Sequence, residues 1–180
     1  TMVAIDDTQA QAGMSRYDDC FKDLIAKQLV TEKQARACAK LLSVTQSYED
    51  IAETDFIFEC VFELLDVKYG VYELIEKHCH RFQALASSTS AISPDDLCGG
   101  FKQKDNLVVA HPWNPPHLVP SVELVASKYI NEKALQTVYQ VLESTGRKVV
   151  TMKKCASGFI GNRLQHAPYR EAVNMFEQAV

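Results

Sequence analysis

The chain has 180 residues, of which 47% are hydrophobic, and a formal net charge of −4 at pH 7. This length and composition exclude a disordered chain and allow one domain with a sizeable core, alone or with part of a second. The basic residues are dispersed, which excludes a basic face for nucleic acid, and no apolar stretch is long enough to cross a bilayer.

Two further features bear on the compartment. The start of the chain lacks the charged head and apolar core of a signal peptide. Six cysteines are scattered without a CxxC pair, in a chain large enough to fold without disulfides. We therefore expect reduced thiols in a cytoplasmic protein.

The first part of the chain predicts a strand followed by two helices. Residues 2–5 form a short apolar run that ends at two aspartates, which indicates a strand entering a turn. Residues 15–30 carry apolar side chains at helical spacing. Thr31 and Gln34 form a capping box for a second helix that continues to residue 42.

The middle of the chain alternates between strand and helix patterns. Residues 56–62 are an apolar run broken by Glu59, typical of a strand buried on both faces, and residues 66–79 show the helical period of a crossover helix. Asn131 is the expected cap of a later helix that stops near Gly146. Further strands are expected at residues 83–89, 107–111, 122–125 and 148–152. From residue 158 the pattern is helical again, with a kink expected at Pro168.

Polar residues stand at the edges of these apolar runs. Ser90, His111, Glu123 and Asn162 each lie beside small or turn-forming residues, and strand ends are where α/β proteins place their sites. Glu123 is informative by itself, because a carboxylate in an apolar strand needs a partner. These four residues are the candidate site.

Several motifs occur together in a fixed order: SSTS at residues 87–90, HPWNPP at 111–116, VELV at 122–125 and GFIGNRL at 158–164. In this combination the sequence resembles the 3-hydroxyacyl-CoA dehydrogenase family, and the likeness extends upstream through ECVFELLDVK nearly to the first residue. HPWNPPHLVPSVELV and GFIGNRLQHA look nearer to the branch of lambda-crystallin and L-gulonate 3-dehydrogenase. The resemblance implies an α/β fold with a doubly wound, Rossmann-type parallel sheet, followed by the start of an all-helical domain.

The resemblance also implies an activity, the NAD-dependent oxidation of a secondary alcohol at carbon 3 of a small-molecule substrate. His111 matches the family's base, and Glu123 matches the glutamate that orients it. Ser90 and Asn162 match the residues that hydrogen-bond the substrate oxygen. Losing one such donor typically lowers the rate by on the order of a hundredfold.

Cofactor residues follow from the same likeness. Asp6 matches the acid that binds the adenosine ribose and favours NAD over NADP. Glu63, Lys68 and Ser90 match residues near the bound dinucleotide. No metal is expected: the run of His78, Cys79 and His80 has ligand chemistry, but neighbouring residues on a helix point in different directions.

The chain departs from the family pattern in its domain plan. The glycine-rich turn expected roughly twenty residues before Asp6 is absent, because the chain begins within what resembles the second strand of the fold. We therefore expect residues 1–154 to be an NAD-binding Rossmann-type domain without its first strand and glycine-rich turn. Residues 155–180 are the expected first helix of a helical dimerisation domain, so the full-length protein is expected to be a homodimer.

The substrate stays open at this point. Tyr17 and Leu24 stand roughly where acyl-CoA enzymes of the family carry a serine and a lysine. The substrate is therefore either an L-3-hydroxyacyl-CoA or a related 3-hydroxy acid such as L-gulonate. The remaining alternatives are a non-catalytic, crystallin-like structural protein and an inactive fragment.

Overall fold

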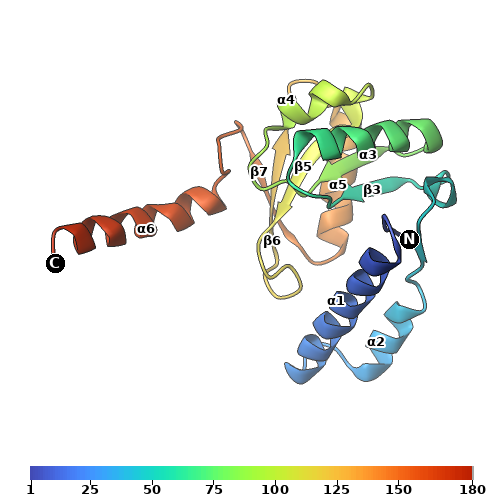
Figure 1. Ribbon diagram of the computed structural model, residues 1–180, viewed down its shortest axis with the longest axis horizontal. Helices are drawn as coiled ribbons and strands as arrows, with labels where there is room; N and C mark the ends of the chain where they lie inside the picture. Colours follow the sequence, from blue (N-terminus) through green and yellow to red (C-terminus); the bar gives the residue numbers. More distant parts are fainter. Residues whose placement is uncertain (180) are drawn as a thin grey trace.

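The structure is a computed structural model that describes residues 1–179, and it confirms a Rossmann-type α/β fold (Figure 1). A five-stranded sheet has the order β3-β4-β5-β6-β7. Its strands are β3 Phe56–Glu59, β4 Ala84–Ser87, β5 Leu107–Pro112, β6 Ser121–Ala126 and β7 Lys148–Met152. The helices on its two faces are α3 Leu65–His78 and α4 Pro94–Leu97 on one, and α5 Glu132–Ser144 on the other. The result is a three-layer domain.

The sheet is parallel over β3, β4 and β5, and its direction then reverses. β6 runs antiparallel to β5, and β7 runs parallel to β6. The physical reason is the connection: residues 113–120 form a short, proline-rich loop, whereas a parallel return needs a crossover of a dozen or more residues. β5 and β6 are therefore paired as a hairpin, and the start of β6 lies beside the end of β5.

The first 45 residues form a separate unit. β1 Met2–Val3 pairs in parallel with β2 Val44–Thr45, and between them lie α1 Asp7–Ala26 and α2 Glu32–Ala39 (Figure 1). The helix predicted for residues 15–30 begins earlier, because Asp6 caps it by accepting a hydrogen bond from the Gln9 amide at 2.7 Å. The predicted capping box of Thr31 and Gln34 is present.

A cavity separates this unit from the larger sheet. Residues of β1, of α1 and of β3 line it, and its volume is about 730 Å³. β1 and β3 are therefore not hydrogen-bonded neighbours, and the seven strands divide into two sheets. The strand predicted for residues 56–62 ends at Glu59, after which the chain bends toward α3.

The core lies on both faces of the five-stranded sheet. Toward α3 and α4, strand residues such as Leu85 and Val109 pack with Tyr72 and Leu97. Toward α5, small strand residues such as Ala84 and Ala110 pack against the helix. The alternation of the two sets along each strand fixes which polar side chains share a face.

The last helix, α6 Gly161–Glu177, extends away from the sheet (Figure 1). It continues through Pro168, and none of its residues is buried. Two short 3₁₀ helices, η2 Cys98–Gly100 and η3 Lys104–Asn106, lead into β5, and a third, η1 Tyr48–Ile51, follows β2. Within residues 1–179 no helix is long and apolar enough to cross a membrane.

Candidate active site

Sheet periodicity brings polar side chains onto the face that carries α3 and α4. Leu107 and Val109 point to this face, so the alternation of β5 also directs His111 there. In β6 the same reasoning applies to Glu123, two residues before the core residue Val125. His111 lies directly opposite Glu123 in the antiparallel register. The two candidates therefore meet where β5 ends and β6 begins.

The two side chains form a buried pair. His111 Nδ1 lies 2.8 Å from Glu123 Oε2, and the two residues are 8% and 1% exposed. Trp113 Nε1 donates to the same oxygen at 3.1 Å. A carboxylate only accepts hydrogen bonds, so the histidine must donate from Nδ1, which leaves Nε2 as its available nitrogen.

The second oxygen of Glu123 is bound to the backbone. The amides of Ile160 and Gly161 donate to Oε1 at 2.7 and 2.9 Å. Burial alone raises the pKa of the Glu123 carboxyl, but the hydrogen bonds from His111, Gly161, Ile160 and Trp113 outweigh it and hold the pKa below its ordinary value. Glu123 is thus kept ionised by four N–H donors.

A strained turn presents these two amides. Gly158 and Phe159 have φ of 73° and 50°, in the left-handed region that an aromatic residue rarely adopts. Phe159 is buried and packs on the His111 ring with the centroids 5.5 Å apart. At Gly161 an added Cβ would lie 2.6 Å from Trp113 Cε2, so only glycine allows the helix start to approach the indole this closely. Sequence reasoning missed Gly161 and the hydrogen bond of Trp113, although both lie inside the quoted motifs.

Ser90 and Asn162 also meet. Asn162 Nδ2 donates to the Ser90 carbonyl at 3.0 Å, while the Ser90 side chain is exposed. The Ser90 amide donates to Glu63 Oε1 at 2.8 Å, as does the Ala91 amide at 3.0 Å. Burial by itself raises the pKa of Glu63, but the hydrogen bonds from Thr89, Ser90 and Ala91 and the charge of Lys68 lower it below its ordinary value. Glu63 therefore fixes the loop that carries Ser90.

Lys68, expected near the dinucleotide, has a fully buried side chain. Its Nζ lies 2.8 Å from Glu59 Oε1 and 3.5 Å from Glu63 Oε2. The reason is electrostatic, since a buried ammonium needs paired carboxylates, and two are within reach. In this conformation Lys68 acts on the site by holding Glu63.

Glu59 is the residue that sequence reasoning did not select. It is 3% exposed and accepts hydrogen bonds from Lys68, from Tyr72 at 3.1 Å and from Ser87 at 2.6 Å. The signal was present, because Glu59 interrupts an apolar strand as Glu123 does. These three side chains, together with the Val61 amide at 2.8 Å, make it the structural centre beneath the loop of Ser90.

Asp6 stands apart from this network. It lies on the smaller unit, just after β1, and is exposed. One of its carboxylate oxygens caps α1. Six of the predicted site residues are therefore connected by successive contacts: His111, Glu123, Asn162, Ser90, Glu63 and Lys68. Asp6 makes none of these contacts.

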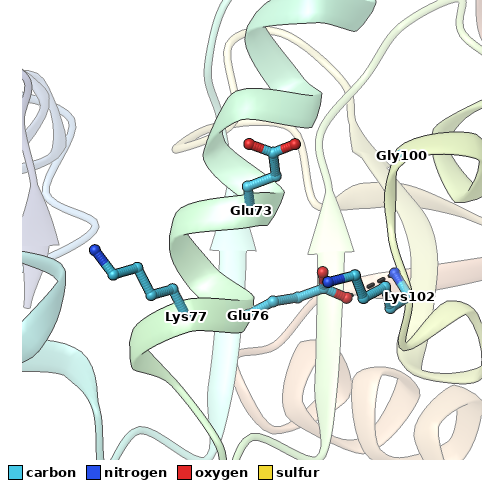
Figure 2. A pocket seen from close by; sticks show the side chains of 5 residues that line it. All are labelled: Glu73, Glu76, Lys77, Gly100 and Lys102. Atoms are coloured by element: carbon cyan, nitrogen blue, oxygen red, sulfur yellow. Dashed lines mark hydrogen bonds between the residues drawn. The ribbon is translucent and has the colours of Figure 1, made fainter.

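Another hollow, of about 360 Å³, lies between α3 and the loop that carries Gly100 and Lys102 (Figure 2). Glu73, Glu76, Lys77, Gly100 and Lys102 line it, and none of them is a candidate site residue. Glu76 accepts hydrogen bonds from the amides of Lys102 and Gln103 at 2.6 and 3.1 Å. Its carboxylate therefore holds a loop. Over residues 1–179, no three His, Cys, Asp or Glu side chains are grouped so as to hold a metal ion.

The geometry agrees with a comparison against known families. Residues 1–155 match the family described as 3-hydroxyacyl-CoA dehydrogenase, NAD binding domain. The chain belongs to the 3-hydroxyacyl-CoA dehydrogenase family. This confirms the resemblance stated from the motifs, and it identifies the matched part of the family as its NAD-binding domain.

Curated relatives of this dehydrogenase family include L-carnitine dehydrogenases. That of Nocardiopsis dassonvillei is 36% identical over 142 residues, which is 79% of this chain and 43% of the relative. That of Oceanobacillus iheyensis is 32% identical over 148 residues, 82% of this chain and 48% of the relative. The matched part of the chain thus spans less than half the length of these two relatives.

Solved structures of the family have the same fold. The (S)-3-hydroxybutyryl-CoA dehydrogenase PaaH1 from Ralstonia eutropha superposes with a TM-score of 0.90 at 25% identity, over 99% of this chain and 62% of that one. FadB2 of M. tuberculosis gives a TM-score of 0.92 at 24% identity, over 98% and 62% of the two chains.

The residues present fit the adenosine part of NAD. The Asp6 carboxylate, at the end of β1, can accept hydrogen bonds from ribose hydroxyls. Ile5, next to Asp6 in the chain, and Phe62 both line the cavity between β1 and β3, and these apolar side chains, each 69% exposed, are suited to a planar base. The chemistry of this donor and apolar set matches a dinucleotide bound across the carboxyl ends of strands.

Proposed function

We propose that the full-length protein oxidises the 3-hydroxyl group of a 3-hydroxy acid or its CoA thioester, with NAD as cofactor. The observation that carries the proposal is the buried His111–Glu123 pair, next to the Asn162–Ser90 contact. Family membership and the L-carnitine dehydrogenase relatives support the reaction type.

His111 is the proposed general base. Nδ1 is committed to Glu123, so Nε2 faces the substrate hydroxyl and takes its proton. Glu123 stabilises the imidazolium that results, and its four N–H donors keep it from rotating away. NAD, when bound, supplies the acceptor for the hydride from carbon 3.

Ser90 and Asn162 are the proposed donors to the substrate oxygen. The Ser90 side chain is exposed on a loop that Glu63 fixes, and Asn162 directly follows Gly161, whose amide is bound to Glu123. Each can donate to the oxygen as it becomes a carbonyl, which lowers the barrier for hydride transfer.

For the substrate we infer that a small 3-hydroxy acid is favoured over a long acyl-CoA. The support is the set of relatives named L-carnitine dehydrogenase, whose named substrate carries a 3-hydroxyl and a carboxylate. Tyr17 and Leu24 in α1, in place of the serine and lysine expected for acyl-CoA enzymes, point the same way.

For the domain plan we propose that the cavity between β1 and β3 is the place of the first strand of the NAD-binding sheet and of its glycine-rich turn. The support is the division into two sheets on either side of a cavity that residues of β1 and β3 line. We further propose that α6 belongs to a helical domain that forms a homodimer, since its apolar side chains are exposed.

The test is turnover by the full-length protein, followed through NADH absorbance. L-carnitine, L-gulonate and L-3-hydroxybutyryl-CoA are offered in parallel with NAD. We expect one of the two free acids to be turned over best, and His111→Gln to lower kcat by at least about a hundredfold. Exposed His166 provides the control, because His166→Gln should leave kcat unchanged.

Two outcomes would contradict the proposal. Turnover by His111→Gln at the wild-type rate would remove His111 as the base. Absence of turnover with all three substrates, in a protein that still binds NADH, would favour the crystallin-like structural alternative.

A further inference from the structure

A second polar cluster lies away from His111, where α1 meets the loop between β5 and β6. His117 Nε2 is 3.0 Å from Asp23 Oδ2, and His117 Nδ1 is 3.7 Å from Cys20 Sγ. Cys20 and Asp23 are three residues apart on α1 and so share one face of the helix. The His117 imidazole therefore lies between the Cys20 thiol and the Asp23 carboxylate and contacts both.

The histidine is held on a braced turn. The amides of Leu118 and Val119 both donate to the Pro115 carbonyl at 3.0 Å, which closes the turn around His117. Arg147 donates to the carbonyls of Pro116 and Val119 from outside. The position of the imidazole is therefore set by the loop and not by Cys20 alone.

The carboxylate fixes how the imidazole is protonated. Hydrogen bonds from Lys27 and then from His117 outweigh burial and hold the pKa of Asp23 below its ordinary value. An ionised carboxylate only accepts, so His117 must donate from Nε2 and present the lone pair of Nδ1 to the Cys20 thiol. Proton transfer from Sγ to Nδ1 then gives a thiolate beside an imidazolium that Asp23 stabilises.

We propose that Cys20 is a reactive thiol that forms mixed disulfides with low-molecular-weight disulfides, activated by His117 and Asp23. The Cys20 proton passes to His117 Nδ1, and the thiolate attacks one sulfur of the disulfide. The S–S bond breaks, and its electron pair remains on the leaving sulfur, which takes the proton from His117. The products are the Cys20 mixed disulfide and one free thiol, so the incoming disulfide is the only oxidant.

Three of the other five cysteines provide the contrast. Cys79 and Cys98 are buried, and burial raises the pKa of both thiols, so they are closed to reagents. Cys38 in α2 is exposed and has no hydrogen-bond partner for its thiol within residues 1–179. Cys38 is more accessible than half-buried Cys20. If exposure alone set the reaction rate, Cys38 would react faster; if His117 activates the thiol, Cys20 reacts faster.

The experiment measures mixed-disulfide formation with glutathione disulfide at pH 7, located by peptide mass after acid quenching. In the wild type we expect Cys20 to react about tenfold faster than Cys38 or more, because His117 Nδ1 is placed to take the Cys20 proton and Cys38 has no such base within residues 1–179. His117→Gln should reduce the Cys20 rate to that of Cys38, and Asp23→Asn should give an intermediate rate. Asp19→Asn is the matched control, since Asp19 is on the same helix but pairs with Lys22.

Equal rates at Cys20 and Cys38 in the wild type would overturn the proposal, and so would a Cys20 rate that His117→Gln leaves unchanged. Circular dichroism checks that each variant is folded. If His117→Gln does not fold, the comparison of Cys20 with Cys38 in one wild-type molecule and the Asp23→Asn rate decide the question.

Discussion

Two buried carboxylates, each in an otherwise apolar strand, bind the segments that form this site. Glu59 and Glu123 are both nearly inaccessible, and each is surrounded by donors, three side chains for Glu59 and four N–H groups for Glu123. A buried carboxylate is tolerated only with such partners, so each marks where distant segments must converge. Sequence alone pointed to Glu123, but its partners at residues 160 and 161 became visible only in three dimensions.

At the residue scale we predict that Glu123→Gln lowers the free energy of unfolding by about 2 kcal/mol at pH 7, the usual size for hydrogen bonds to a charged group. A glutamine has one acceptor oxygen, and its amide would face N–H donors of either His111 and Trp113 or the helix start. Urea unfolding measures the loss. Exposed Glu171 gives the control, because Glu171→Gln should leave stability unchanged.

The same variant has a predicted pH dependence. The pKa of Glu123 is lower in the folded state than in the unfolded chain, so its stabilisation is complete above the ordinary carboxyl pKa. It is lost as the pH falls through that value to the lowered folded pKa. The stability difference between wild type and Glu123→Gln should therefore shrink on acidification; a difference that grew toward low pH would contradict the sign.

At the element scale, local signals gave most of the helices and strands, and tertiary contacts set their ends. β7 spans the predicted residues 148–152, and Asn131 caps α5 by accepting from the Ala134 amide at 2.7 Å. By contrast, β3 stops at Glu59, because Lys68 and Ser87 draw its carboxylate into the interior and the chain turns there. No periodicity within residues 56–62 could indicate that end.

The helix α6 carries a prediction about association. Tyr169, Val173 and Phe176 lie on one face of the helix and form an apolar stripe, and Phe176 is 85% exposed. We predict that the chain self-associates through this stripe and that Val173→Glu with Phe176→Glu yields a monomer, because charges oppose burial of the stripe. Size-exclusion chromatography with light scattering measures the mass. Ala167→Glu with Asn174→Glu changes the net charge equally on the opposite face of α6 and should preserve association; a monomeric wild type would refute the prediction.

At the scale of the whole molecule, the two sheets differ in how firmly they are built. β4 and β5 lie in the core, whereas α1 and α2 contain no buried residue and β1 and β2 pair over two residues each. The hydrogen bond between His117 and Asp23 is one of the ties between the units. The N-terminal unit should therefore open more easily than the five-stranded sheet.

Hydrogen exchange followed by mass spectrometry tests this difference. Amides of α1 and α2 should exchange roughly a hundredfold faster than those of β4 and β5. The reason is that local opening of these two helices exposes little buried surface and therefore costs less free energy. Equal protection in the two regions would mean that the molecule opens as one unit and would contradict the prediction.

The sequence by itself determined the element types, the family and the four residues of the candidate site, because strand alternation, helix caps and ordered motifs are local properties of the chain. The tertiary structure decided what those residues contact. It reversed the direction of the sheet at the short loop after His111, buried Lys68 between two glutamates, and brought residues 160–162 onto Glu123 and Ser90. These contacts join segments 30 or more residues apart in several cases, and no local pattern encodes which distant donor will meet a buried carboxylate.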